Sequence, residues 1–224
     1  MTESSFHPTR WTLVLRARGE GEVAKLALSD LCAAYYEPVV GFMRREGRTD
    51  DEARETAHAF FETVLAGGLG APEPGRGKFR SYLLGALKHF LGKQRAAVLA
   101  GKRGGGMEQV ALVDDTGAPD DTLAFDRDWA MNLIARALGA LEAEHAGKSQ
   151  EFATLKPWLD GGASSSQANA AHMLGMSGTA VKVAIHRLRV RFRELIRAEV
   201  AATVDDPAEV AGELRHLIAV ATRG

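Results

Sequence analysis

Residues 167–199 read QANAAHMLGMSGTAVKVAIHRLRVRFRELIRAE, and this stretch predicts a short helix, a turn and a long second helix. Gly175 supplies the positive φ angle that a tight turn between helices requires, and Ser177 follows as a natural N-cap. Small or apolar residues stand where two steeply crossing helices must pack, namely Ala170, Ala171, Leu174, Met176, Val181 and Ala184. The pattern as a whole is typical of a helix-turn-helix.

The second helix of this unit separates apolar side chains from basic ones. At about 100° per residue it carries one apolar stripe, formed by Val181, Ala184, Ile185, Leu188, Phe192 and Leu195. Residues 178–200 contain six basic and two acidic residues, a net charge of +4. A basic surface helix in a helical hairpin is one interpretation. The glycine turn and the full apolar register favour DNA binding instead.

A recognition helix offers its first residues to base edges and its arginines to phosphates. The side chains expected to contact duplex DNA are Ser177, Thr179, Lys182, Val183, His186, Arg187, Arg189 and Arg193. Thr179, Lys182 and His186 lie about one turn apart on the outward face, so we expect them to face the bases. Arg187 and Arg189 flank this face and are expected to contact phosphates.

Composition narrows the class of protein. The chain has 224 residues, 46% of them hydrophobic, and a net charge of −1. That is enough apolar material for one or two folded domains. The single cysteine, Cys32, excludes a disulfide framework and is consistent with a reducing cytoplasm. The first residues lack the apolar core of a signal peptide, and no apolar run approaches the ~18 residues of a membrane span. We expect a cytoplasmic protein without membrane insertion.

Catalytic motifs are missing from the sequence. The seven histidines show neither a metalloprotease spacing nor a zinc-site spacing with cysteine, and there is no nucleophile-elbow motif. We expect no catalytic residues, no metal, no cofactor and no enzymatic activity.

Helical patterns recur along the whole chain and strand patterns are nearly absent, so the predicted class is all-α. Helices are expected over residues 9–16, 22–37, 39–45, 50–65, 78–99, 128–144 and 149–159, and from about residue 207 to residue 222. Glycine-rich and acidic residues near 101–125 indicate a flexible linker. The predicted organisation is therefore a first domain over residues 1–100, a linker over 101–125 and a second domain over 126–224.

A second basic segment precedes the linker. Residues 76–103 contain eight basic residues and no acidic one, whereas residues 108–128 contain seven acidic residues and one basic residue. Aromatic rings interleaved with cations hold unstacked single strands, because rings stack on bases and cations follow the backbone. The candidate residues for this contact are Lys78, Phe79, Arg80, Tyr82, Lys88, Lys93 and Arg95. The alternative is that the aromatic residues belong to a hydrophobic core.

Four pieces of the chain in this order resemble the extracytoplasmic-function (ECF) type of bacterial sigma factor. They are SDLCAAYYEPVVGFMRREG, DDEARETAHAFFETVL, GRGKFRSYLLGALKHFL with a KRGGG end, and LKPWLDGGA leading into LGMSGTAVKVAIHRLRVRFRELIRAEV. The resemblance covers nearly the full length. It is nearest to a subgroup that opens with Thr-Arg-Trp, here Thr9, Arg10 and Trp11.

The resemblance implies two DNA-binding domains and a partner, core RNA polymerase. The first domain would bind the polymerase and the melted −10 element, and the second would read the −35 element of promoter DNA. Polymerase-binding residues carried over from the family are Glu55, His58, Phe60 and Phe61. His58 and Ala59 replace the usual Gln-Glu step. An anti-sigma factor or another regulator is a further expected partner.

Two other functions are compatible with the same residues. One is a helix-turn-helix DNA-binding regulator that no longer binds polymerase, which the His58-Ala59 departure favours. The other is a helical interaction protein whose basic helices have no DNA-binding role.

Overall fold

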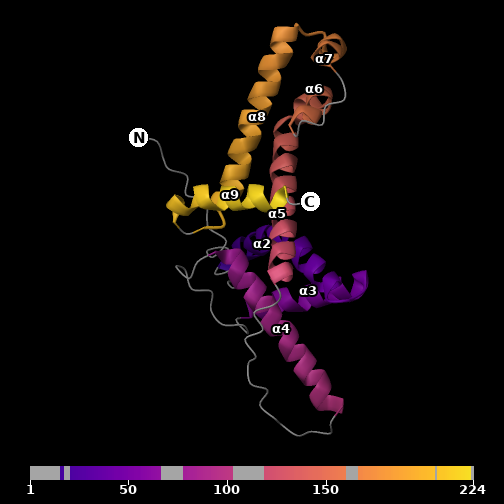
Figure 1. The fold of residues 1–224 in the computed structure, drawn as a ribbon, viewed down its shortest axis with the longest axis vertical. Helices are drawn as coiled ribbons and strands as arrows, with labels where there is room; N and C mark the ends of the chain where they lie inside the picture. The colour runs from indigo at the N-terminus through magenta and orange to yellow at the C-terminus, as the bar shows by residue number, and fades with distance from the viewer. Residues whose placement is uncertain are drawn as a thin grey trace. The chain divides into compact units, whose positions relative to one another are not determined.

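The computed structural model describes residues 16–17, 21–66, 78–102, 119–159, 166–204 and 206–222, and the regular structure in these residues is entirely helical (Figure 1). The α-helices are α2 (Glu22–Arg45), α3 (Asp50–Leu65), α4 (Phe79–Lys102), α5 (Pro119–Glu144), α6 (Ser149–Leu155), α7 (Gln167–Leu174), α8 (Gly178–Ala201) and α9 (Val210–Ala221). Short 3-10 turns are η1 (Ala146–Lys148), η2 (Lys156–Trp158) and η3 (Pro207–Glu209). The all-α class is confirmed.

Two compact units make up the chain. Unit 1 consists of residues 1–132 and 201–224, and unit 2 of residues 133–200. The predicted boundaries differ from these, because the C-terminal segment groups with the first unit and not with the second. No helix in the described ranges combines the length and the apolar character needed to cross a bilayer.

α5 begins earlier than predicted. Residues 119–125 are helical, although the sequence indicated a linker there, and residues 103–118 lie outside the described part. Pro119 presets the φ angle of a first helical residue. Asp121 follows in the first turn, where the helix dipole stabilises acids. The acidic composition that suggested a linker is therefore also a helix-start signal. Most of the helix expected over residues 9–16 also lies outside the described part.

Helices α2, α3 and α4 supply most of the core of unit 1. Its largest fully buried side chains include Leu31, Tyr35, Met43, Phe60, Phe79, Leu83 and Leu87. α3 starts with a capping box, in which Thr49 accepts from the backbone N–H of Glu52 and the Glu52 carboxylate accepts from that of Thr49. The helix predicted over residues 50–65 is confirmed.

A proline inside α2 is compensated by a side chain of α5. Pro38 has no N–H to donate to the carbonyl of Ala34, one helical turn earlier. Asn132 donates its side-chain amide to that carbonyl at 2.6 Å and lies 3.2 Å from the Ala33 oxygen. As a result, α2 continues through Pro38 as one helix, whereas the sequence predicted two segments. The same hydrogen bond holds the first part of α5 against α2.

α5 also approaches α2 closely at Gly41. A Cβ atom built on Gly41 would lie 2.6 Å from Oδ2 of Asp128, which pairs with Arg45 at 2.5 Å. Glycine is therefore needed at position 41 for the carboxylate to keep its place beside the arginine.

A buried group of charged side chains joins three segments of unit 1. Arg80 of α4 is 5% exposed, and its Nε donates to Asp126 of α5 at 2.9 Å. Its Nη1 donates to Glu213 of α9, which is 1% exposed. His216 of α9 lies 2.6 Å from the second oxygen of Asp126. Removing one partner of a buried ion pair leaves an uncompensated charge and typically costs about 3–5 kcal/mol. These contacts tie α9 to α4 and α5.

The helix predicted after residue 207 is confirmed, but its buried face differs from the predicted one. Asp206 caps η3 by accepting from the backbone N–H of Ala208 at 2.8 Å. The apolar residues at helical spacing in this segment, Val210, Leu214, Leu217 and Ile218, predict one buried face. The structure buries Glu213, Leu217 and Val220, and Ile218 is 59% exposed. The ion pair with Arg80 accounts for this rotation, because it turns Glu213 inward.

Unit 2 is built around one apolar cluster. Its buried members are Leu141, Phe152, Leu155, Trp158, Ala170, Val181, Ile185 and Leu188. Partly buried side chains packed against it are Leu138, Leu159, Ala171, Leu174, Met176, Ala184, Phe192 and Leu195. All residues of the stripe predicted on the long helix lie in this cluster, so the predicted stripe is confirmed.

The compensation between Pro38 and Asn132 predicts a specific coupling. We expect Asn132→Ala to lower the free energy of unfolding by about 1–3 kcal/mol, because the Ala34 carbonyl loses its donor. In a Pro38→Ala background the helix regains its own N–H donor, so the same substitution should cost about 1 kcal/mol less. Urea unfolding of the four proteins of this double-mutant cycle measures the coupling. Equal costs in both backgrounds would contradict the assignment.

Candidate nucleic-acid interface

A glycine turn joins α7 to α8. Ser166 caps α7 by accepting from the backbone N–H of Asn169 at 3.2 Å. Gly175 ends the helix with a φ of 61°, in the left-handed region that glycine adopts without strain. The N–H of Met176 then donates to the carbonyl of Ala171 at 2.9 Å, which satisfies a free carbonyl at the end of α7. The predicted turn at Gly175 is confirmed.

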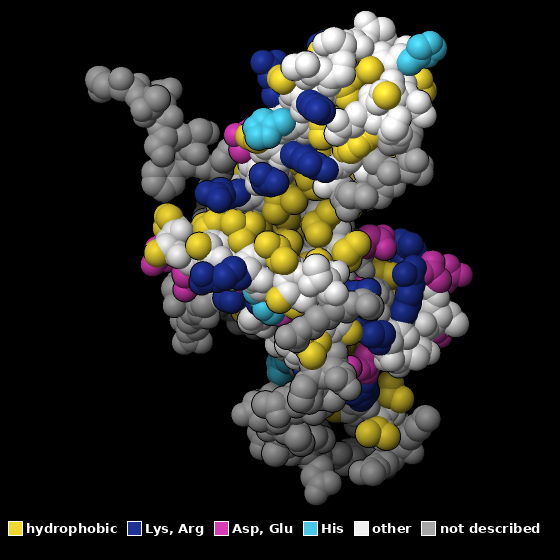
Figure 2. All heavy atoms as spheres, turned by 45° about the horizontal axis from the view of Figure 1, so that its top comes forward, with side chains coloured by type: hydrophobic (Ala, Val, Ile, Leu, Met, Phe, Trp, Pro, Cys, Tyr) yellow, Lys and Arg dark blue, Asp and Glu magenta, His cyan; other side chains and the backbone are white. Residues whose placement is uncertain are grey.

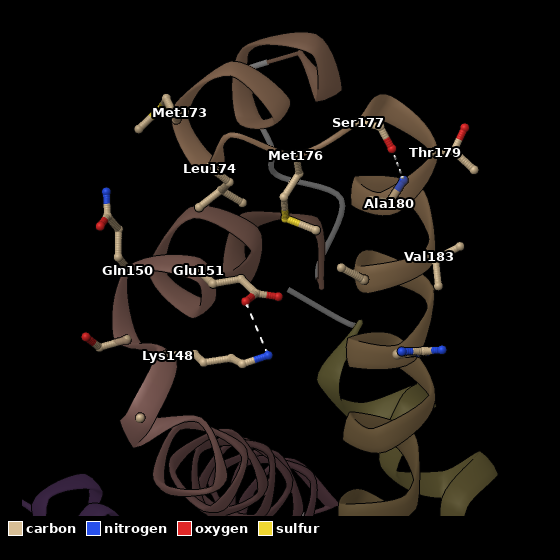
Figure 3. A pocket seen from close by; sticks show the side chains of 14 residues that line it. Lys148, Gln150, Glu151, Met173, Leu174, Met176, Ser177, Thr179, Ala180 and Val183 are labelled. Carbon is tan, nitrogen blue, oxygen red and sulfur yellow. Dashed lines mark hydrogen bonds and ion pairs between the residues drawn. The ribbon is translucent and has the colours of Figure 1, made fainter.

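The start of α8 is capped, and its side chains diverge. The Ser177 hydroxyl accepts from the N–H of Ala180 at 3.2 Å. In Figure 3, Met176 points into the space between α6 and α8, whereas Thr179 and Val183 project from the other side of α8. An open groove of about 950 Å³ lies between these helices, and Lys148 and Glu151 are among its lining residues.

Most side chains predicted to contact duplex DNA are exposed. They are Ser177, Thr179, Lys182, Val183, His186, Arg187 and Arg193. Within the described part of the chain, no ion pair involves Lys182, Arg187 or Arg193, so their charges face solvent. Figure 2 shows lysine, arginine and histidine side chains along α8, among apolar and uncharged ones. An exposed valine on this otherwise polar face also offers an apolar contact.

Arg189 has a structural partner. It is half-buried, and its Nε donates to the backbone carbonyl of Trp158 at 2.8 Å. This contact attaches α8 to η2 through a carbonyl that needs a donor. Arg189 therefore has a structural role through Nε, and its predicted contact with a phosphate stays a prediction.

Arg191 also forms ion pairs with other side chains of unit 2. Its Nη2 lies 2.6 Å from Glu144 and its Nη1 lies 2.9 Å from Glu194. The hydrogen bond from Arg191 lowers the pKa of the Glu144 carboxyl, and the same bond raises the pKa of Arg191. The basic residues of α8 thus fall into two groups, one facing solvent and one holding the unit together.

The predicted single-strand site on α4 is only partly at the surface. Phe79 is fully buried and packs edge-on against Tyr35 at 5.1 Å between ring centroids. Arg80 is buried in its ion pairs, and Lys78 lies 2.6 Å from Glu213. Tyr82 is half-buried against Phe79, with the ring centroids 5.9 Å apart. Phe79 and Arg80 are therefore interior residues in this conformation, which corrects the expectation that they meet DNA directly.

The remaining cations lie further along α4. Lys88 is half-buried, and Lys93 and Arg95 are exposed. Arg95 forms an ion pair with Glu46 at the end of α2. Lys88 and Lys93 are thus the charges of α4 that most readily meet a phosphate.

The predicted polymerase-binding residues on α3 also divide into exposed and buried ones. Glu55 and His58 are exposed, and Nε2 of His58 lies 3.1 Å from the Tyr36 hydroxyl. Phe60 and Phe61 are 0% and 4% exposed, so they are core residues and not surface contacts. Their spacing from the buried residues Ala53, Ala57 and Val64 follows the helical period, a signal available in the sequence.

Sequence reasoning missed the buried carboxylates of unit 1. Asp126 and Glu213 neutralise Arg80, yet they lie 46 and 133 residues away from it in the chain. Helical periodicity places Glu213 on the same face as the buried residues Leu217 and Val220. The sequence therefore indicates that Glu213 is buried, but not which cation pairs with it. Among the described residues, no group of three or more His, Cys, Asp and Glu side chains is arranged to hold a metal ion.

Comparison with known proteins adds no further assignment. No protein-family model matches the chain, and no curated protein or solved structure matches it significantly.

Substitutions can distinguish the arginines of α8 that hold unit 2 together from those that face solvent. We expect Arg189→Ala to lower the free energy of unfolding by about 1–3 kcal/mol, because it leaves the Trp158 carbonyl without its donor. Arg193→Ala removes the same charge from an exposed position and should change stability by less than about 0.5 kcal/mol. Urea unfolding followed by circular dichroism provides the comparison. Equal stability of the two variants would show that the Arg189 hydrogen bond does not stabilise unit 2.

Proposed function

We propose that this protein is an alternative sigma factor, which directs core RNA polymerase to promoters and has no catalytic activity of its own. The observation that carries the proposal is the exposed basic face of α8, where Lys182, Arg187 and Arg193 form no ion pair with the described residues, directly after a glycine turn and a capped helix start. In this proposal α7 and α8 form a helix-turn-helix. The N-terminal part of α8 enters the major groove of the −35 element.

The proposed base contacts are Thr179, Lys182 and His186, and the proposed phosphate contacts are Arg187 and Arg193. Lysine can donate to a guanine edge, and an exposed imidazole can donate or accept. Val183 lies on the same exposed face, 44% exposed, and offers an apolar contact for a thymine methyl group. Cations that already bind protein acids, such as Arg191, are not needed for this contact.

A second surface would bind the melted −10 element. Support comes from Lys88 and Lys93 of α4, with Tyr82 half-buried about two turns before the first and about three turns before the second. Single-strand binding requires cations that follow the phosphate backbone and an aromatic ring on which a base can stack.

Polymerase binding is proposed for the exposed face of α3. Glu55 supplies a negative charge there, and no ion pair within the described ranges neutralises it. The opposite face of α3 is buried in the core, so the helix presents a rigid surface.

A DNA-binding regulator is the second candidate, and His58 favours it. This residue stacks on Tyr36 at 5.3 Å between ring centroids and contacts its hydroxyl, so its ring already has an intramolecular partner. Co-purification of the full chain with core RNA polymerase distinguishes the two functions. The sigma-factor proposal requires a stoichiometric complex, whereas specific DNA binding without such a complex would favour the regulator.

We expect Glu55→Lys to weaken polymerase binding, because it reverses the charge at the proposed contact without disturbing the core. Asp30→Lys makes the same change in charge at an exposed position of α2 and serves as the matched control. Pull-down of core polymerase by each folded variant provides the measurement. Retention of wild-type binding in Glu55→Lys would show that the contact lies elsewhere.

We expect Lys182→Ala and Arg193→Ala to differ in how they affect DNA binding. Loss of a base-reading residue should cost about 1–3 kcal/mol at one base pair and relax the preference there. Loss of a phosphate contact should weaken all sequences alike and reduce the salt slope by about 1. Binding selection from random duplexes at matched salt compares the two. An unchanged preference in Lys182→Ala, with uniformly weaker binding, would place another residue in the groove.

A further inference from the structure

The start of α4 forms an anion site that α9 occupies. The Glu213 carboxylate receives Nη1 of Arg80 on one oxygen and lies 2.6 Å from Nζ of Lys78 on the other. The carboxylate and the arginine are 1% and 5% exposed. Two cations converging on one carboxylate have the charge and donor pattern that also binds a phosphate group.

The arginine of this site is held independently of α9. Asp126 binds its Nε at 2.9 Å, and its guanidinium carbon lies 5.1 Å from the centre of the Trp129 ring. Both contacts come from α5. If α9 leaves, Arg80 therefore keeps its orientation with Nη1 directed at the vacated position, and Lys78 stands two residues before it in the chain. An arginine fixed in this way is preorganised for an anion.

Within the described ranges, α9 has few other means of attachment. Its buried side chains besides Glu213 are Leu217 and Val220, while Arg215 and Ile218 are exposed. His216 contacts Asp126, a residue that Arg80 already neutralises. A twelve-residue helix held by the Glu213 carboxylate, the His216 contact and two buried apolar side chains can open without unfolding the α2–α4 core.

We propose that Lys78 and Arg80 form a binding site for a backbone phosphate of single-stranded DNA, and that Glu213 occupies this site until α9 dissociates. The inference rests on the proposed function, since it assigns a further contact and its control to the strand-binding helix α4. It also gives Arg80 a role in DNA binding, which this residue can take only after α9 has dissociated.

Native-state hydrogen exchange of the wild-type protein tests the opening step without any DNA. We expect the amides of residues 210–221 to exchange through a separate opening, of lower free energy than that of residues 79–91. Identical protection of both segments would overturn the inference, because α9 would then open only with the whole unit.

Fluorescence anisotropy with a labelled oligothymidylate tests the binding step. Glu213→Gln removes the competing charge, and Glu209→Gln removes a charge from the exposed part of the same segment as a control. We expect Glu213→Gln to bind roughly tenfold more tightly at about 0.1 M salt, and its salt slope to increase by about 0.7 for one added phosphate contact. Unlabelled inorganic phosphate serves as a competitor. Displacement of the strand by phosphate at low concentration would mean that the site takes the free ion, which would also overturn the inference.

A second pair of variants releases α9 without changing any charge. Leu217→Ala should increase strand binding in the same direction, and the exposed Ile218→Ala should not. Faster exchange of α9 in these variants, with affinity and salt slope at the wild-type level, would overturn the inference and leave the proposed function standing. A complete lack of strand binding in every variant would remove the proposed −10 contact of α4 as well.

Discussion

Neutralisation of the Arg80 guanidinium is the constraint on which unit 1 depends. A charged group that is 5% exposed must be paired, because burying it alone would cost more than the domain can compensate. Asp126 of α5 neutralises it within the core, and Glu213 of α9 adds a second carboxylate from a distant part of the chain. These two ion pairs connect the first part of α5 and the C-terminal segment to the first unit. The amide of Asn132 at Pro38 and the small residue Gly41 allow α5 to lie close to α2.

The basic residues serve two purposes in both units, and burial separates them. In unit 1, Arg80 is an internal ion-pairing residue, whereas Lys88 and Lys93 lie outside the described ion pairs. In unit 2, Arg189 and Arg191 bind a carbonyl and two carboxylates, whereas Lys182, Arg187 and Arg193 face solvent. A net charge counted from sequence therefore overestimates the charge that DNA would meet. The proposed interface is smaller than the basic segments suggest, but its cations form no ion pair in the part of the chain that the structure describes.

Local features of the fold could be predicted from sequence, and distant pairings could not. The α3 helix, the turn at Gly175 and the apolar stripe of α8 depend on neighbouring residues, such as Thr49 with Glu52 or Val181 with Ile185. The pairing of Arg80 with Glu213 joins residues 133 positions apart, and no periodicity indicates it. Phe60, Phe61 and Phe79 show the remaining difficulty, since an aromatic residue beside charged ones suits a binding surface and a core equally well in sequence. All three rings are buried, so these residues belong to the core.

The most direct test of the account is transcription of genomic DNA by core RNA polymerase with and without this protein, followed by sequencing of the transcript starts. If the protein directs initiation, a defined set of new start sites that share an upstream sequence should appear, and this set should shift when Lys182 is replaced. The polymerase alone should not use these sites. Identical start sites with and without the folded protein would contradict the central claim that it directs initiation.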